Sequence, residues 1–331
     1  MSIICGLLKG KKPGDEDGRQ AAKARLQARR GKHRLDKASA SAGQASPDDQ
    51  KGQAVGNGQA ALVVTEDPVT QRFEKQESFR KVATASSIHL GTRLMQQDAC
   101  FVTATTSFWD GEYQMNTIGI VCDGMGGLDN GAEASQLVVE TMLADIASIG
   151  QVSDPPGFFA TEVAKLDALV TERFGINEAG TTLAVAVLSG DHLYWCSVGD
   201  SRIYLINEAG ITQLTRDHNY QLVLEEKVGR GLIAAEAALN DPQRESLISF
   251  LGMGGVEVFD INQSPLAVKH GDTVLLCSDG LTKSLTDDEI KEVVMGNFGA
   301  VEEAARLLPI VAFDTGGTKD NTSVVIIQYL K

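Results

Sequence analysis

Five aspartates stand where short apolar runs begin or end, and three of them neighbour a glycine. They are Asp98, Asp123, Asp200, Asp279 and Asp320. One such aspartate carries little information, because aspartate often starts a turn. Five carboxylates gathered in one cleft would repel one another unless cations lay among them. Oxygen ligands without histidine or cysteine suit hard cations, and glycine lets a backbone carbonyl approach the ion closely. These residues therefore predict a site for Mn²⁺ or Mg²⁺.

Short β-branched runs indicate the strands that must position these carboxylates. They are Thr117–Cys122, Thr182–Leu188, Leu193–Val198, Ile203–Ile206, Thr273–Cys277 and Ser323–Tyr329. Composition and apolar spacing predict helices over Ala132–Ile149, Thr161–Phe174 and Val301–Phe313. The sequence Thr286-Asp287-Asp288-Glu289 has the spacing of a capping box, so a further helix should begin at Asp287.

The connection Gly199–Arg202 between two of these strands is short. Its length predicts a hairpin between Leu193–Val198 and Ile203–Ile206, and hairpins imply antiparallel sheet. Strand pairs and long helices that occur in blocks favour an α+β layered domain over a doubly wound one.

The first 75 residues differ in composition from the rest of the chain. Residues 1–40 contain 11 Lys and Arg against 4 Asp and Glu, a net charge of +7; the whole chain has −14, so residues 41–331 carry −21. Such a segment buries too little apolar surface to offset its ordering entropy. We expect a disordered basic tail and linker over 1–75 and a folded domain over 76–331. Contact of the tail with a membrane surface, a partner or the acidic domain stays open.

Charge, hydropathy and cysteine pattern exclude several classes of protein. A net charge of −14 argues against nucleic-acid binding. No run reaches the roughly 18 apolar residues that span a bilayer, and Ile3–Leu8 is too short for a secretory signal. The 5 cysteines form no C-x-x-C pair, which argues against a zinc site or a disulfide framework. Reduced thiols in the cytoplasm are the expectation.

Seven short motifs follow one another between residues 79 and 331. They are Arg93-x-x-x-Gln97-Asp98, Asp123-Gly124-Met125-Gly126-Gly127, Gly180-Thr181-Thr182, Gly199-Asp200-Ser201-Arg202, Leu214-Thr215-Arg216-Asp217-His218, Ser278-Asp279-Gly280-Leu281 and Asp320-Asn321-Thr322-Ser323. In this order they resemble the motifs of the metal-dependent protein phosphatases of type 2C, and of their bacterial branch in particular. The resemblance implies an α+β fold, a four-layer αββα sandwich with two central antiparallel β-sheets flanked by helices. It also implies a metal site at one end of the sandwich.

The resemblance further implies which residues hold two Mn²⁺ or Mg²⁺ ions. Asp123 resembles the carboxylate that bridges the two ions, and Gly124 resembles the residue that offers its backbone oxygen to the second. Asp279 and Asp320 resemble the other ligands of the first ion. Asp98 resembles an outer ligand that acts through water.

A third ion and a substrate-binding residue are also implied. Asp200, with Asp279, resembles the ligands of a weaker third ion, and Arg93 resembles the residue that holds the substrate phosphate. A phosphomonoester carries nearly two negative charges, which repel an incoming hydroxide. Two ions about 4 Å apart can lower the pKa of a bridging water, and with Arg93 they neutralise the phosphoryl oxygens. Direct in-line attack by the bridging hydroxide is the implied mechanism, with Arg93, Asp123 and Asp279 as catalytic residues.

Two positions depart from the family pattern. Met125 stands where many members have a histidine that is proposed to protonate the leaving group, so another acid, such as a metal-bound water, has to serve. Gln97 stands where many relatives have glutamate. Neither change removes an inner ligand of the first ion, and we expect an active enzyme.

Several other polar residues are expected to be structural. No two histidines have the spacing of metal ligands, and His218 should order the loop after Thr215. Arg202 should pair with nearby carboxylates. Cys122 and Cys277 should pack in strands.

The leading hypothesis is a serine/threonine protein phosphatase that acts on phosphoproteins made by a bacterial kinase, or on the kinase itself. One alternative is a pseudophosphatase that only docks phosphoproteins; its expected loss of Asp123, Asp279 or Asp320 is not seen. Another is a hydrolase of small phosphoesters. A flap over residues 219–253, which we expect to gate the site, and the basic tail fit a macromolecular substrate better.

Overall fold

The computed structural model describes residues 82–109, 112–127, 129–146, 154–315 and 320–330. The expected tail over 1–75 and the start of the domain at residue 76 lie outside these ranges. So does Gly316-Gly317, which follows the last helix of the chain.

The described strands form two sheets, and every strand pair in them is antiparallel. The seven-stranded sheet follows the order β10-β6-β5-β3-β2, with β4 on β3 and β9 on β6. Its strands are β2 (Asp98–Trp109), β3 (Glu112–Gly126), β4 (Ala179–Thr181), β5 (Leu183–Ser189), β6 (His192–Val198), β9 (Asp260–Ile261) and β10 (Leu266–Ala267). The five-stranded sheet has the order β1-β12-β11-β7-β8. Its strands are β1 (Val82–His89), β7 (Arg202–Asn207), β8 (Gly210–Gln213), β11 (Thr273–Cys277) and β12 (Thr322–Tyr329).

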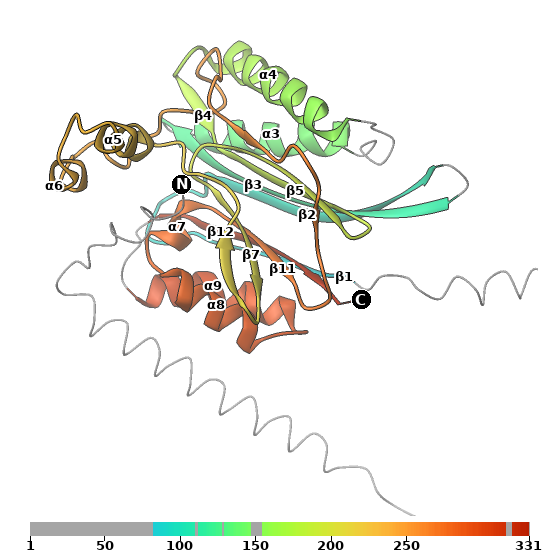
Figure 1. The fold of residues 1–331 in the computed structure, drawn as a ribbon. Helices are drawn as coiled ribbons and strands as arrows, with labels where there is room; N and C mark the ends of the chain where they lie inside the picture. The colour runs from blue at the N-terminus through green and yellow to red at the C-terminus, as the bar shows by residue number, and fades with distance from the viewer. Residues whose placement is uncertain (1–81, 110–111, 128, 147–153, 316–319, 331) are drawn as a thin grey trace, which may run out of the picture.

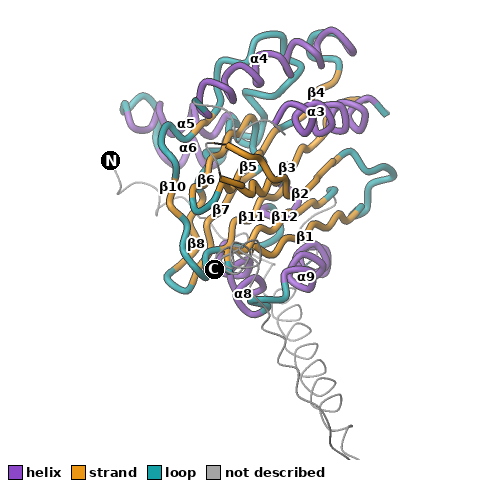
Figure 2. The backbone as a smooth tube through the Cα atoms, turned by 90° about the vertical axis from the view of Figure 1, so that its right-hand side faces the viewer, coloured by secondary structure: helices purple, strands orange, loops and turns teal. Residues whose placement is uncertain are grey.

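Helices cover the outer face of each sheet, as Figures 1 and 2 show. The seven-stranded sheet carries α3 (Asn130–Ile146) and α4 (Pro155–Phe174). The five-stranded sheet carries α7 (Asp279–Thr282), α8 (Asp287–Gly296) and α9 (Val301–Asp314). The two helices α5 (Tyr220–Gly229) and α6 (Ala235–Leu239) stand apart from these layers at one side of the sandwich. The expected αββα architecture is confirmed.

Three apolar clusters hold the layers together. One lies between the seven-stranded sheet and α3 and α4, and a second lies between the five-stranded sheet and α8 and α9. The third lies between the two sheets and includes Val121, Ala186, Leu276 and Val325. Because β3, β5, β11 and β12 are covered on both faces, their sequences are apolar runs with little polar alternation. Burying one Val, Leu or Ile side chain contributes about 1.5–3 kcal/mol.

Local signals explain where two of the helices begin. The capping box at α8 is present, with the Thr286 side chain accepting from the Glu289 amide and the Glu289 side chain accepting from the Thr286 amide. The predicted start at Asp287 is confirmed. Helix α4 begins at Pro155 rather than at Thr161, because Asp154 caps it by accepting a hydrogen bond from the Gly157 amide. None of the described helices is both long and apolar enough to cross a bilayer.

The predicted hairpin between Leu193–Val198 and Ile203–Ile206 is wrong. Strand β6 belongs to the seven-stranded sheet and β7 to the five-stranded sheet, so the connection between them crosses from one sheet to the other. Gly199 makes this crossing with φ at 96°, a conformation that residues with a side chain rarely adopt. His218 secures the crossing, since the Gly199 amide donates to His218 Nδ1 over 3.1 Å and the His218 amide donates to the Gly199 carbonyl over 2.9 Å.

Candidate active site

Asp98 and Asp123 face each other on paired strands of the seven-stranded sheet. The register of β2 and β3 sets them opposite each other. Two threonines hold the backbone of Asp123: its amide donates to Thr182 Oγ1 over 2.9 Å, and its carbonyl accepts from Thr181 Oγ1 over 3.0 Å. The Thr182 amide also donates to the Asp123 carbonyl over 2.9 Å. The Gly180-Thr181-Thr182 motif therefore positions the backbone that carries the expected bridging carboxylate.

Gly124 sits where no side chain fits. Its amide donates to the Gln97 carbonyl over 3.1 Å. A Cβ on residue 124 would lie 2.1 Å from the carbonyl oxygen of Gly131 and 2.4 Å from that of Gln97. Since both contacts are with backbone, they could be relieved only by moving β3 away from its neighbours. The glycine allows the backbone of β3 to pack closely against Gln97 and Gly131.

Asp279 is the first residue of α7, at the end of β11 in the five-stranded sheet. The preceding Ser278 connects the two sheets: its hydroxyl donates to Asp98 Oδ2 over 2.8 Å and accepts from the Ser323 amide over 2.9 Å. A Cβ on Gly280 would lie 2.0 Å from the carbonyl oxygen of Asn321. Ser278 and Gly280 thus fix the place of Asp279 relative to Asp98.

Arg93 pairs with Asp320. The guanidinium donates to Asp320 Oδ2 over 2.8 Å, and the arginine side chain stays 54% exposed. An exposed guanidinium at the edge of a carboxylate cluster can still bind phosphate oxygens with its other donors.

The structure assigns a positioning role to Asn321, which the sequence indicated only as a member of the Asp320–Ser323 motif. Its Oδ1 accepts from the Gln97 amide over 2.8 Å, and its Nδ2 donates to the carbonyls of Leu90 and Met95 over 2.9 and 3.1 Å. Asn321 therefore holds both ends of the loop that carries Arg93. Its place directly after Asp320 was the one signal that could have pointed to it.

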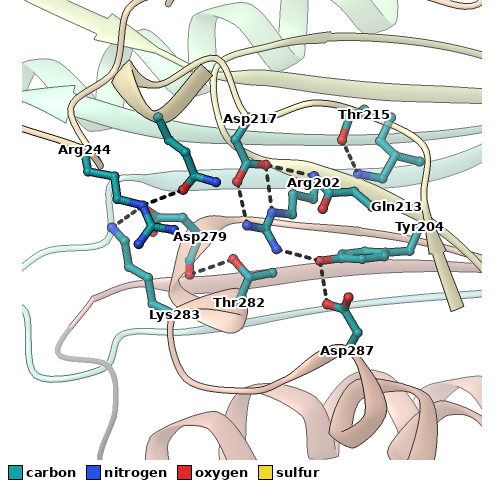
Figure 3. Close-up of polar contacts among 12 residues, drawn as sticks. Arg202, Tyr204, Gln213, Thr215, Asp217, Arg244, Asp279, Thr282, Lys283 and Asp287 are labelled. Atoms are coloured by element: carbon teal, nitrogen blue, oxygen red, sulfur yellow. Dashed lines mark hydrogen bonds and ion pairs between the residues drawn. The ribbon is translucent and has the colours of Figure 1, made fainter. Parts of the chain in front are cut away.

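Lys283 is a second residue of the site that was not predicted from the sequence. Its ammonium forms an ion pair with Asp279 Oδ2, and Figure 3 shows the two side chains together at α7. The signal was present in the sequence, because residues four apart on a helix face the same side. It was not used, because the helix α7 was not expected.

The site carboxylates share an unfavourable electrostatic environment. The pKa of Asp98 is raised to about 6, mainly by burial and less by the charges of Asp279 and Asp320, although the Ser278 and Ser323 hydroxyls lower it. Burial also raises the pKa of Asp200 to about 7, with a smaller contribution from Asp279.

Asp123 lies at the centre of this set. Burial raises its pKa well above the usual value, and the charges of the other four aspartates add to the rise: Asp98, Asp279, Asp200 and Asp320. The structure thus brings together all five aspartates that the sequence singled out, from both sheets.

The residues present fit hard cations. Asp98 Oδ1 and Asp279 Oδ1 are buried and have no hydrogen-bond partner among the described residues. Buried carboxylate oxygens without donors are costly unless a cation binds them. Within the described ranges, no three His, Cys, Asp or Glu side chains stand close enough to form a ready metal cluster. Instead, Arg93 forms an ion pair with Asp320, and Lys283 forms one with Asp279.

Three expectations about neighbouring residues are confirmed. Arg202 pairs with a carboxylate, donating to both oxygens of Asp217 over 2.8 and 2.6 Å. His218 is fully buried and orders the backbone at Gly199, next to Asp200. Cys122 and Cys277 are buried in strands and are free thiols.

Comparison with known proteins gives consistent results. The family model described as protein phosphatase 2C matches residues 86–308. The serine/threonine phosphatase stp of Listeria monocytogenes is 32% identical over 217 residues, which cover 63% of this chain and 83% of the relative. The serine/threonine protein phosphatase PstP of Mycobacterium tuberculosis is 34% identical over 219 residues, covering 62% of this chain and 39% of the relative.

Solved structures that resemble this chain are also serine/threonine phosphatases. The crystal structure of Mycobacterium tuberculosis PstP/Ppp superposes with a TM-score of 0.58 at 26% identity, covering 76% of this chain and 99% of that one. A structure of the PstP catalytic domain in complex with two manganese ions has a TM-score of 0.58 at 27% identity, with coverage of 76% and 99%.

Proposed function

The chain belongs to the protein phosphatase 2C family, and from this premise we propose that it is a metal-dependent phosphatase of phosphoserine and phosphothreonine in proteins. One observation carries the proposal. Five aspartates from both sheets converge, so that burial and the charges of the other four raise the pKa of Asp123, and buried oxygens of Asp98 and Asp279 lack hydrogen-bond partners among the described residues. Such a set is stable only with cations among the carboxylates.

Asp123, Asp279, Asp320 and the backbone oxygen of Gly124 would hold two Mn²⁺ or Mg²⁺ ions. The two manganese ions in the related PstP structure support this number. When bound, such ions supply a hydroxide nucleophile near neutral pH and neutralise phosphoryl charge. Asp98 would act at the second coordination sphere, since its Oδ2 already accepts a hydrogen bond from Ser278.

Arg93 would orient the substrate phosphate. Its guanidinium is half exposed, and the pairing with Asp320 sets its position beside the metal ligands. A phosphate placed between the guanidinium and the ions would have its charge balanced from both sides, which favours attack in line with the leaving oxygen. Met125 offers no proton, so the leaving alkoxide takes its proton from another source.

The flap over residues 219–253 supports a protein substrate. It contains α5 and α6, which stand apart from the sandwich in Figure 1. Glu245 of the flap lies close enough to Asp279 that its charge raises the pKa of that carboxyl, after the larger effect of burial. Arg244 donates to Gln221 over 2.8 Å and so ties the end of the flap to α5 at its start. A surface of this kind beside the site would contact the chain around a phosphorylated residue.

The substrates we propose are phosphoproteins made by a serine/threonine kinase of the same cell, or that kinase itself. The names of the relatives, which are serine/threonine phosphatases, support this class. We place the chain in the cytoplasm because the cysteines of the described residues are free thiols, which suits a reducing compartment.

The test is phosphate release from a phosphothreonine peptide, with and without Mn²⁺, by the wild type and by Asp279→Asn. We expect release that requires Mn²⁺ and that falls by about 10²-fold or more in the variant, because a metal ligand is lost. Asp288→Asn is the matched control, since Asp288 is exposed on α8 and should keep full activity.

Two results would redirect the proposal. A folded wild type that binds the phosphopeptide but releases no phosphate at any Mn²⁺ concentration would indicate a docking module. Release from a small aryl phosphate but not from phosphopeptides would indicate a hydrolase of small phosphoesters.

A further inference from the structure

Lys283 places a positive charge inside the carboxylate cluster. It directly follows α7, four residues after Asp279, and its ammonium forms an ion pair with Asp279 Oδ2. The side chain is 42% exposed, whereas that of Asp279 is only 14% exposed. The ammonium therefore reaches inward from the surface to a largely buried carboxylate.

Three aspartates surround this ammonium. Partial burial lowers the pKa of Lys283, but the charges of Asp279, Asp200 and Asp320 outweigh that effect and raise it. The interaction is mutual for Asp200: burial and Asp279 raise its pKa, and the charge of Lys283 lowers it. Lys283 is thus close to both carboxylates that the family resemblance implied for a third metal ion.

The two oxygens of Asp279 have different surroundings. Oδ2 accepts from Lys283, while Oδ1 is buried without a hydrogen-bond partner among the described residues. One carboxylate can therefore serve two cations at once, with Oδ1 left for an ion shared with Asp123. The ion pair with Lys283 does not compete for that oxygen.

We propose that the ammonium of Lys283 takes the place of a third metal ion between Asp200 and Asp279, so that this chain binds two ions and supplies the third positive charge itself. The inference rests on the proposed function, because it assumes the two-ion site. A divalent ion and an ammonium close to the same carboxylate oxygen would repel each other strongly at low dielectric. Lys283 therefore excludes an ion from this position and partly neutralises Asp200 and Asp279.

The test is a count of Mn²⁺ bound per chain, by equilibrium dialysis of the metal-stripped full chain against Mn²⁺. We expect two ions for the wild type and three for Lys283→Met, which keeps the apolar stem and removes the charge. Lys283→Arg should bind two, because it retains a cation. The matched control is Lys291→Met on α8, where the lysine contacts the carbonyl of Glu208 over 3.1 Å and not the site; it should bind two.

A second substitution locates the additional ion. Lys283→Met combined with Asp200→Asn should return the count to two, because the pair of carboxylates is broken. Three ions in the wild type, or two in Lys283→Met, would overturn the inference and leave the proposed function intact. A wild type that binds no Mn²⁺ would overturn both. The count does not depend on activity, so the outcomes can be told apart.

Discussion

Two groups of charged side chains lie near each other in this protein and differ in how their charges are balanced. In the first, the metal-site group, Asp98, Asp123, Asp200 and Asp279 gather with raised pKa values, and Asp98 and Asp279 each have a buried oxygen that lacks a hydrogen-bond partner among the described residues. In the second, shown in Figure 3, Arg202 and Asp217 neutralise each other over two hydrogen bonds of 2.8 and 2.6 Å.

The second group, the Arg202 network, extends its hydrogen bonds in both directions. Arg202 donates to the Tyr204 hydroxyl over 2.9 Å, and that hydroxyl donates to Asp287 over 3.3 Å. Gln213 donates to Asp217 over 2.9 Å. The network joins β7 and β8 to the start of α8. Because donors and acceptors match within it, it supports the fold, whereas the metal-site group would need cations from outside to balance its charge.

The largest expected effect is on activity. Asp123→Asn should lower the rate of phosphate release by about 10²- to 10³-fold, because the central carboxylate is lost. It should also raise the melting temperature of the metal-free protein, since it removes a charge that its four neighbouring aspartates destabilise. Calorimetry in a chelator and a phosphopeptide assay check both. A variant that keeps its rate, or whose metal-free form melts at a lower temperature, would contradict the assignment of Asp123.

Breaking the Arg202 network should lower stability, whereas Asp123→Asn should raise that of the metal-free protein. Arg202→Met leaves Asp217 without its cation in a site where the two side chains are only 24% and 22% exposed. We expect a loss of about 2–3 kcal/mol in the free energy of unfolding, measured by urea titration. Arg306→Met is the control, since the Arg306–Glu303 pair is 54% and 27% exposed and should contribute less than about 1 kcal/mol. Equal losses of unfolding free energy in the two variants would show that the Arg202–Asp217 pair contributes no more than an exposed surface pair.

The pH dependence of stability should come from the metal-site group. Asp98 has a folded-state pKa of about 6, which is above its unfolded value. Its contribution to the free energy of unfolding is therefore fully present below about pH 4 and is lost as the pH rises through 6. The metal-free protein should therefore lose about 2 kcal/mol from this residue between pH 4 and pH 7.

Urea titrations in a chelator at pH 4.5 and pH 7.5 measure that loss. Asp98→Asn should show a smaller difference between the two pH values, and added Mn²⁺ should restore stability to the wild type at pH 7.5. A wild type that becomes more stable over this range would refute the raised pKa of Asp98.

The smallest expected effect concerns a single hydroxyl. Tyr204→Phe removes the hydrogen bonds to Arg202 and Asp287 but keeps the ring, which is fully buried. We expect a loss of about 1 kcal/mol in stability and an unchanged rate of phosphate release at saturating Mn²⁺. A large fall in the rate would mean that the Arg202 network acts on the metal site and is not separate from it.

Much of the fold could be predicted from short-range patterns. The apolar runs identified β5, β6, β7, β11 and β12 to within a few residues, and the Thr286–Glu289 spacing located the start of α8. These signals are local, because strand and helix periodicity and capping depend on residues a few positions apart. The type of metal was equally accessible, since it follows from having oxygen ligands alone.

Which strands pair, and which distant segments contact each other, could not be predicted from such local patterns. The short Gly199–Arg202 connection looks like a hairpin, yet β6 pairs with β5 and β7 pairs with β11. That outcome depends on the packing of one sheet on the other. Asn321 likewise reaches across 231 positions of sequence to Leu90.

The sequence by itself determined many of the strands, the longer helices and the acidic residues of the site, because each follows from residue type and local spacing. Only the tertiary structure decided that five aspartates share one environment and that Arg202 has its own carboxylate. It also decided that Lys283 stands among Asp200, Asp279 and Asp320. The physical reason is that Coulomb interactions depend on distance in space, and the chain brings these charges together only when its two sheets pack.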